Sequence, residues 1–301
     1  MATIITRKVK GNEYYYLSYS YRDGKKVLKE EKYLGPDLPE FDDLVKIWEE
    51  FSYVIVKERY FSKIEKIFDA YRKIVNKTPK DIFLKNLRNF GIRFTHHSNK
   101  IEGSSLSLRD VKAVVDNETL PPNKRVDDVI EAKAHMNVYK ELIDTKSELS
   151  MDLICEWHRK LFRLTKYDIA GFIRDYPVGI EGSNYEPPIS KIEIEMLLED
   201  LFEWYEDKKK LYHPVFLAAV MHYRFIAIHP FGDGNGRMTR LMTCYILHKN
   251  GYPMFDIDPK IRRQYYNALE KADKKEDNEL PFILWFFKHY IMDNKRYLAT
   301  P

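Results

Sequence analysis

The sequence predicts a mostly helical protein with a small antiparallel sheet in front. After residue 41, apolar residues recur at helical spacing over most of the chain, whereas the first 35 residues follow the pattern of strands. Only 12 of the 301 residues are glycine and 14 are proline, which favours helices over fibrous or low-complexity structure. Hydrophobic residues make up 44%, enough for one large domain with an appendage or for two modest domains.

Residues 1–36 are expected to form a three-strand β-meander. The aromatic run from Tyr14 to Tyr21 lies between turn signals at Lys10-Gly11-Asn12 and Arg22-Asp23-Gly24, and an extended pattern resumes at Val27. We interpret the meander as a structural appendage with one packed face. The alternative is a docking surface for a target protein, a second subunit or nucleic acid, because lysine and arginine interleave with the tyrosines.

Residues 40–103 are expected to form helices that precede the main domain. The apolar stripe from Leu44 to Ile55 and its continuation from Ile64 to Tyr71 have the helical period. Thr78 is a candidate N-cap with Pro79 at the first helical position, and Gly103 is a typical helix stop.

Residues 104–293 are expected to form the main helical domain, followed by a short tail at 294–301. Ser107 with Asp110, and Ser190 with Glu193, are predicted to begin helices. The other helices are predicted at 126–144, 151–164, 191–207, 214–228, 236–249, 259–273 and 280–293. Between 171 and 188 the pattern breaks, and its glycines and prolines predict an extended β-hairpin, or flap.

Composition excludes several classes of function. The net charge of +4, from 50 Lys+Arg against 46 Asp+Glu, gives no basic excess that would indicate nucleic-acid binding. The two cysteines, Cys155 and Cys244, argue against a disulfide scaffold or a thiolate metal cluster. The chain start does not read as a secretory leader, and no apolar run reaches the roughly 20 residues of a membrane helix. We therefore expect a soluble, reduced, cytoplasmic protein that does not bind membranes.

One segment carries the chemistry. Residues 229–240 read His-Pro-Phe-Gly-Asp-Gly-Asn-Gly-Arg-Met-Thr-Arg and lie between two apolar helical stretches, so they form a loop that opens into a helix N-terminus. Such a loop directs backbone N–H groups at an anion, and its glycines allow close approach. Arg237 and Arg240 share a helix face, Asp233 offers a hard oxygen ligand for Mg²⁺, and His229 can take a proton near neutral pH. The residues alone predict a Mg²⁺-dependent nucleotide site with a histidine base.

The same string resembles the signature of Fic-domain proteins, H-x-F-x-[D/E]-G-N-G-R-x-x-R, at every specified position. The resemblance covers roughly residues 85–293 and leaves the first 80 outside. It implies a Fic-type helical bundle with a β-hairpin flap. The implied activity is transfer of AMP from ATP to a Ser, Thr or Tyr hydroxyl of a protein. The related Doc toxins, which transfer phosphate, usually lack the Gly234-Asn235-Gly236 pattern, so its presence favours nucleotidyl transfer.

The resemblance also implies roles for single residues. His229 would be the general base and Asp233 would hold Mg²⁺ between the α- and β-phosphates. Arg237 would contact the α- and β-phosphates and Arg240 the γ-phosphate. The anion cradle would consist of Gly232, Gly234, Asn235 and Gly236.

A second motif predicts inhibition. Ser98-Asn99-Lys100-Ile101-Glu102-Gly103 resembles the family's inhibitory pattern, [S/T]-x-x-x-E-[G/N], which ends a helix upstream of the catalytic motif. By this resemblance Glu102 pairs with Arg240, keeps the γ-phosphate from it and holds basal activity low. Two alternatives stay open: Glu102 is a surface carboxylate at a helix end, or it aligns a water that removes AMP from modified proteins.

The flap and two tyrosines complete the predicted site. Gly171 to Arg174 begins a segment that resembles the family's target-docking hairpin, which pairs with a substrate strand. We expect Gly182, Ser183, Asn184 and Tyr185 near the nucleotide, and Tyr265 and Tyr266 either against adenine or in the core. The expected partner is a protein target, with self-modification and a homodimer as further options. A competing hypothesis from another class is a non-catalytic nucleotide-sensing module.

Overall fold

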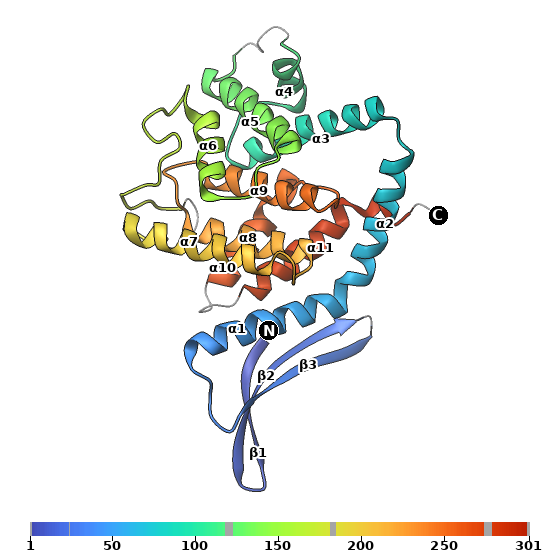
Figure 1. Ribbon diagram of the computed structural model, residues 1–301, viewed down its shortest axis with the longest axis vertical. Coiled ribbons are helices and arrows are strands. Elements are labelled where there is room, and N and C mark those ends of the chain that lie inside the picture. Colours follow the sequence, from blue (N-terminus) through green and yellow to red (C-terminus); the bar gives the residue numbers. More distant parts are fainter. Residues whose placement is uncertain (1, 24, 118–122, 181–184, 274–278, 300–301) are drawn as a thin grey trace.

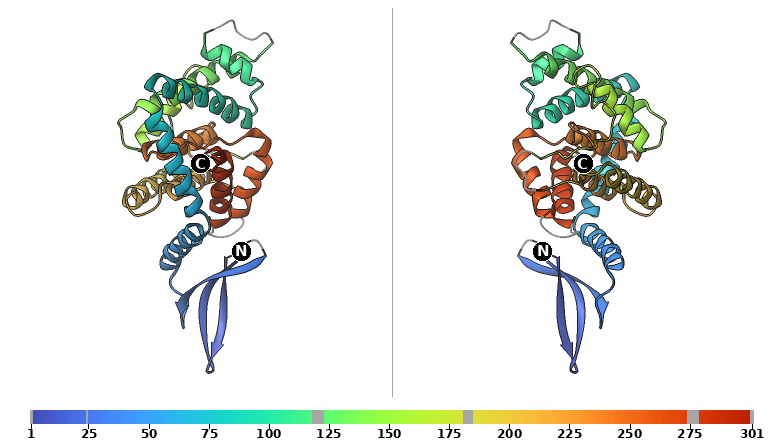
Figure 2. Two further views of the ribbon diagram at one scale, coloured as in Figure 1. Left: turned by 90° about the vertical axis from the view of Figure 1, so that its right-hand side faces the viewer. Right: turned by 90° about the vertical axis from the view of Figure 1, so that its left-hand side faces the viewer.

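The computed structural model describes residues 2–23, 25–117, 123–180, 185–273 and 279–299. A three-stranded sheet lies at one end of an elongated molecule, helix α1 crosses above it, and the other helices form the body (Figures 1 and 2). The expected combination of a small sheet and a mostly helical protein is confirmed.

The N-terminal sheet is an antiparallel meander in the order β1 (Ala2–Val9), β2 (Asn12–Asp23), β3 (Lys26–Gly35). Its inner face uses alternate residues of β2, because successive side chains of a strand point to opposite faces. Leu17 and Tyr19 are buried there against Phe51 and Ile55 of α1 and Leu280 of the helical body. This small core fixes the predicted appendage onto the rest of the chain.

Three helices lead from the sheet to the site: α1 (Phe41–Val56), α2 (Ser62–Lys77) and α3 (Lys80–Ile101), with a π-helical turn at Lys57–Phe61. The prediction that Thr78 is the N-cap of α3 is wrong. Its hydroxyl donates to the carbonyl of Ile74, 2.6 Å away, and so closes α2, while Pro79 takes the N-cap position. The Thr78 side chain is directed back to α2, so α3 begins without a side-chain cap.

The body contains the remaining helices, and the predicted ranges agree with them within a few residues. Their bounds are α4 (Leu108–Val115), α5 (Val126–Asp144), α6 (Met151–Phe162), α7 (Lys191–Lys208), α8 (Pro214–Ile228), α9 (Asn235–Lys249), α10 (Arg262–Asp273) and α11 (Leu280–Asp293), with 3-10 turns at Pro259–Ile261 and Lys295–Tyr297. Ser107 and Asp110 form the expected capping box at α4, and the Ser190 hydroxyl accepts from the Glu193 N–H at α7.

Helices α8 and α9 form the centre of the body, and the site lies at the loop between them. Most side chains of both helices are buried. Helix α8 is apolar on nearly all sides, whereas α9 buries polar residues such as Asn235, Thr239 and Arg240 together with its apolar ones. A helix buried on all sides cannot shift without opening the core, so the α8–α9 loop has a rigid base.

The flap differs from the predicted β-hairpin. No strand is assigned to the described residues on either side of 181–184, that is, to 171–180 and 185–190. Instead the Arg174 guanidinium joins the two arms by donating to the carbonyls of Tyr176 and Pro188, and its Nε donates to the carbonyl of His229, 2.8 Å away. Proline at 187 and 188 supplies no N–H for a strand ladder, so side-chain bonds take its place.

Among the described residues, no helix is both long and apolar enough to span a bilayer.

Candidate nucleotide-binding active site

The loop between α8 and α9 is shaped by two residues with left-handed backbone. His229 ends α8 at φ 52°, and Gly234 begins α9 at φ 82°. Asn235 locks the turn between them: its Oδ1 accepts from the Phe231 N–H at 2.9 Å, and its Nδ2 donates to the Phe231 carbonyl at 2.7 Å. The Asn235 side chain is therefore occupied within the loop. Only its backbone N–H, at the helix N-terminus, is placed to serve an anion cradle.

Close packing explains the three loop glycines. A Cβ on Gly232 would collide with the Tyr176 hydroxyl, and a Cβ on Gly234 would collide with the Phe162 ring. A Cβ on Gly236 would collide with the carboxylate of Glu102. The Glu102 carboxylate, at the end of α3, thus lies directly against the N-terminus of α9, where an anion is electrostatically favoured.

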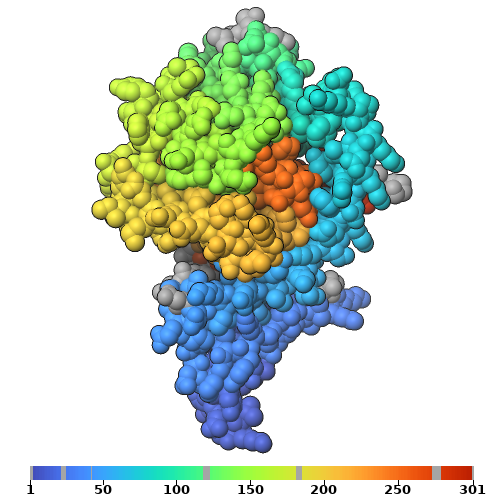
Figure 3. Space-filling model, viewed as in Figure 1, coloured from blue at the N-terminus to red at the C-terminus, as the bar shows by residue number. Residues whose placement is uncertain are grey.

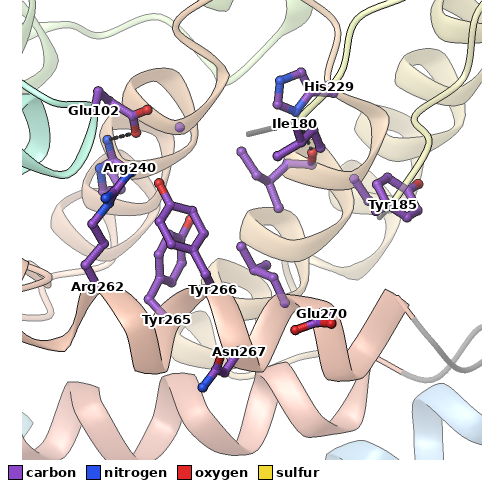
Figure 4. A pocket seen from close by; sticks show the side chains of 14 residues that line it. Glu102, Ile180, Tyr185, His229, Arg240, Arg262, Tyr265, Tyr266, Asn267 and Glu270 are labelled. Atoms are coloured by element: carbon purple, nitrogen blue, oxygen red, sulfur yellow. Dashed lines mark hydrogen bonds and ion pairs between the residues drawn. The ribbon is translucent and has the colours of Figure 1, made fainter. Parts of the chain in front are cut away.

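The loop borders a cavity of about 320 Å³. Figure 4 shows His229 and Tyr185 on one side, Glu102 and Arg240 on the other, and α10 below. The predicted residues that line the cavity are Glu102, Tyr185, His229, Gly236, Arg240, Tyr265 and Tyr266. Sequence reasoning missed four further residues of α10, which carry no recognisable motif: Arg262, Asn267, Leu269 and Glu270. The predicted residues Gly182, Ser183 and Asn184 lie outside the described residues.

The predicted Glu102–Arg240 ion pair is present. Glu102 Oε1 accepts from Arg240 Nη2 at 2.7 Å, as the dashed line in Figure 4 marks. Ser98 holds the same guanidinium: its hydroxyl accepts from Nε and its carbonyl from Nη2, each at 2.9 Å. Burial alone would lower the pKa of Arg240, but the neighbouring Glu102 carboxylate raises it, so this guanidinium is firmly charged.

One donor of Arg240 remains unused. Its Nη1 is buried and has no hydrogen-bond partner among the described residues, and it lies beside the Cα of Gly236. A buried polar atom without a partner is costly, so such an atom in a cavity wall is a candidate contact for a ligand.

His229 has the geometry of a base. Its Nδ1 lies 3.2 Å from the Ile226 carbonyl, and because a carbonyl can only accept, the proton of neutral His229 is on Nδ1. Nε2 then carries the free lone pair. Burial lowers the pKa of His229, which keeps the ring neutral and able to accept a proton at pH 7.

Arg237 is not in the cavity wall. It is 3% exposed, and its Nη1 is bound to the Glu131 carboxylate and lies 3.4 Å from Asn99 Oδ1, while its Nη2 lies 3.3 Å from Asp233 Oδ1. Lys166 completes the cluster, 2.7 Å from Glu131 and 2.9 Å from Asp233. Sequence reasoning missed Glu131 and Lys166, since they come from other parts of the chain.

Asp233 is chemically suited to hold Mg²⁺. Its carboxylate is 41% exposed at the start of α9, and the neighbouring Arg237 and Lys166 outweigh burial and keep its pKa below the usual range, so it is ionised. No group of three or more His, Cys, Asp or Glu within the described ranges could hold a metal alone. One carboxylate suits Mg²⁺ that takes its remaining oxygen ligands from nucleotide phosphates and water.

His158 supports the loop from α6. Its Nε2 donates to the Asp233 carbonyl at 2.9 Å, its Nδ1 accepts from the Gly171 N–H at 2.8 Å, and its ring stacks on Phe231. Burial lowers the pKa of His158 to about 4, so this neutral histidine joins the α8–α9 loop to the flap. No sequence pattern marks it, because its partners are backbone atoms.

The two tyrosines of α10 differ in exposure. Tyr265 is 1% exposed, and its hydroxyl lies 2.9 Å from Nε2 of His222, so most of it belongs to the core. Tyr266 is half-buried and presents more of its ring to the cavity. Both point toward the Arg240 end of the cavity in Figure 4. Tyr266 is therefore the better placed of the two to pack against a base.

Comparison with known proteins agrees with this fold. Residues 148–247, which include the flap, His158 and the loop, match the Fic/DOC family model. The protein adenylyltransferase fic-1 of Caenorhabditis elegans is 29% identical over 213 residues, which are 69% of this chain and 41% of the relative. The protein adenylyltransferase Fic of Nematostella vectensis is 32% identical over 195 residues, which are 62% of this chain and 44% of the relative.

One solved structure matches a larger share of this chain, and of its own length, than the two curated relatives do. A Fic domain containing signaling protein from Bacteroides thetaiotaomicron has 27% identity and a TM-score of 0.69, and the match covers 78% of this chain and 95% of that one. Residues 148–247 therefore match the Fic/DOC family, and the fold is similar to that of a Fic domain protein over most of its length. It spans less than half the length of the two curated relatives.

Proposed function

We propose that this protein is a Mg²⁺-dependent protein adenylyltransferase that moves AMP from ATP to a Ser, Thr or Tyr hydroxyl of a protein, and that Glu102 inhibits it. The observation that carries the proposal is the Glu102 carboxylate at the N-terminus of α9, bound to Arg240. At this place the helix N-terminus and the Arg240 guanidinium together hold the Glu102 carboxylate, and the same two groups could hold a phosphate. The names of the curated relatives support the same activity.

The reaction needs a base aligned on a hydroxyl. The hydroxyl oxygen attacks the α-phosphorus, its proton passes to Nε2 of His229, and the bond to the β-phosphate breaks so that pyrophosphate leaves. Transfer at phosphorus depends mainly on positioning and on charge stabilisation. The hydrogen bond that Nδ1–H donates to the Ile226 carbonyl orients the ring for this role.

Nucleotide binding would use the cavity and the start of α9. The phosphates would accept from backbone N–H groups of the loop and from Arg240, including its unpaired Nη1. Asp233 would hold Mg²⁺, which supplies charge neutralisation for the phosphates when it is bound. The base would lie against Tyr266 near α10. Arg237 would act by holding Asp233 and the loop in place.

Inhibition follows from competition for Arg240. While the Glu102 carboxylate occupies the guanidinium, a γ-phosphate at that place would meet a like charge, which disfavours the productive pose. Release would require Glu102 to turn away or α3 to shift.

Removal of AMP from a modified protein is the second candidate. Glu102 and His229 line the same cavity, and the Glu102 side chain is 28% exposed, so a water could bind between them. In that reaction Glu102 would align the water for attack on the phosphorus.

The test is label transfer from α-labelled ATP with Mg²⁺ to the chain itself or to lysate proteins. We expect weak transfer by wild type, strong transfer by Glu102→Gly and none by Glu102→Gly/His229→Ala. ATP binding without transfer by any of the three would support a nucleotide-sensing module instead. Loss of label from premodified protein, in wild type but not in Glu102→Gly, would support AMP removal.

The remaining expectations stay part of the proposal. They are a protein target, self-modification, a homodimer and a cytoplasmic location. The divisions at 1–36, 40–103, 104–293 and 294–301 also remain a proposal.

A further inference from the structure

A second concave surface lies between α6 and α7, away from the nucleotide cavity. It encloses about 930 Å³ and is lined by residues from the start of α6, from one face of α7 and from the flap. In Figure 3 the yellow-green surface that includes α6 and the yellow surface of α7 adjoin on the face toward the viewer. We call this surface the α6–α7 groove.

The floor of the groove is apolar. Leu149 and Leu198 lie at its base and are almost fully buried, and Met151, Ile173 and Phe202 are partly exposed above them. Partly exposed apolar side chains grouped in a concave surface are a candidate contact for another molecule.

The rim of the groove is acidic. Its charged residues are Glu148, Asp152, Glu195, Glu199, Glu203, Glu206 and Asp207, and no lysine or arginine is among the described residues that line it. Lys209 pairs with Glu148 and Glu206, and Lys191 lies near Glu195. The other four carboxylates have no ion pair within the described part of the chain. The whole chain has a net charge of +4, so this concentration of negative charge is local.

The dimensions fit a short helix. The acidic and apolar residues of α7 that line the groove run from Glu195 to Asp207, a length of about 18 Å at a rise of about 1.5 Å per residue. A helix in such a groove places an apolar residue on the floor at every third or fourth position and its polar residues at the rim. Lysine or arginine at those rim positions would meet the carboxylates.

We propose that the α6–α7 groove binds an amphipathic, basic helix of another protein. The groove shares Ile173 with the flap, and the next residue, Arg174, is bonded to the His229 carbonyl. A bound helix would therefore lie beside the flap. The inference rests on the groove alone and does not require the transfer reaction.

The experiment measures binding of labelled 16-residue peptides to the full chain by fluorescence anisotropy at low salt. The probe is a leucine–lysine peptide with helical apolar spacing. One control peptide replaces leucine by serine at the same charge, and another replaces lysine by glutamate. We expect saturable binding of the leucine–lysine peptide only.

The decisive variant is Glu199→Lys/Glu203→Lys, which reverses two unpaired rim charges. It should weaken binding about tenfold or more, since two attractive rim pairs are lost and the reversed charges repel the peptide. Glu58→Lys/Asp69→Lys changes net charge equally at exposed sites outside the groove and should leave binding unchanged. Phe202→Ala should also weaken binding.

Three results would overturn the proposal. The first is no binding of the leucine–lysine peptide, and the second is equal binding of the serine–lysine peptide. The third is a wild-type chain that self-associates in sedimentation while Glu199→Lys/Glu203→Lys stays monomeric, because the occupant would then be a second copy.

Discussion

Replacing Glu102 by glutamine should release Arg240 while nearly preserving the shape of the side chain. Glutamine keeps the volume of glutamate but loses the charge that holds the buried guanidinium at 2.7 Å. A hydrogen bond to a charged group contributes about 1.5–3 kcal/mol, and about 1.4 kcal/mol corresponds to a factor of ten in rate. The amide oxygen of glutamine can still accept from Arg240, so only part of this contribution is lost. If the bond must open before the γ-phosphate reaches Arg240, the initial rate of AMP transfer should rise severalfold, and by no more than roughly 150-fold.

The assay is the initial rate of label incorporation from α-labelled ATP at saturating Mg²⁺. Ser98→Ala serves as the graded control, because it removes the hydroxyl that binds Arg240 Nε but leaves the carboxylate in place. Its effect should be smaller than that of Glu102→Gln, because the Glu102 carboxylate still supplies the negative charge that holds the guanidinium. The reasoning fails if Glu102→Gln is no faster than wild type, or if Ser98→Ala activates as strongly.

Three further outcomes are expected. Glu131→Gln should destabilise the fold by about 3–5 kcal/mol in urea denaturation, because it leaves buried Arg237 without its principal counter-charge. Gly234→Ala should destabilise by more than about 1–2 kcal/mol in the same assay, since the left-handed backbone disfavours alanine and the Cβ would overlap the Phe162 ring. The transfer rate of Glu102→Gly should rise with pH to a plateau whose midpoint lies below 6.5, because burial lowers the pKa of His229 and only the neutral ring accepts a proton.

Controls separate these effects from general damage. Glu156→Gln removes an exposed carboxylate that pairs with Lys160 on α6, and should change stability by less than about 1 kcal/mol. Gly179→Ala adds a Cβ into open space and should be nearly neutral. The packing described above would be contradicted if Glu156→Gln destabilised as much as Glu131→Gln, or Gly179→Ala as much as Gly234→Ala. A midpoint of the pH profile above 7 would contradict the burial of His229.

The loop and the helices are largely predictable from the sequence because they depend on local chemistry. Helical periodicity locates α8 and α9, and the glycines and charged residues between them identify an anion site. The Glu102–Arg240 pair joins residues 138 positions apart, and it was predicted only through the resemblance of both segments to known motifs. Physical periodicity alone could not have paired them.

The rest of the site could not be predicted because its contacts are non-local. His158 and Arg174 act on backbone carbonyls, which leave no signature in the sequence, and Glu131 reaches Arg237 from another helix. The flap was expected to pair as strands, yet in its described residues side-chain bonds from Arg174 join the arms. Thr78 could not be assigned from the sequence for a similar reason, because its hydroxyl could bond either to the end of α2 or to the start of α3.

The most direct test of the proposed activity compares α-labelled with γ-labelled ATP on Glu102→Gly. AMP transfer predicts stable protein labelling from the α position and none from the γ position, with the labelling lost in Glu102→Gly/His229→Ala. Labelling from the γ position would mean phosphate transfer and would contradict the roles assigned to the α9 N-terminus and His229.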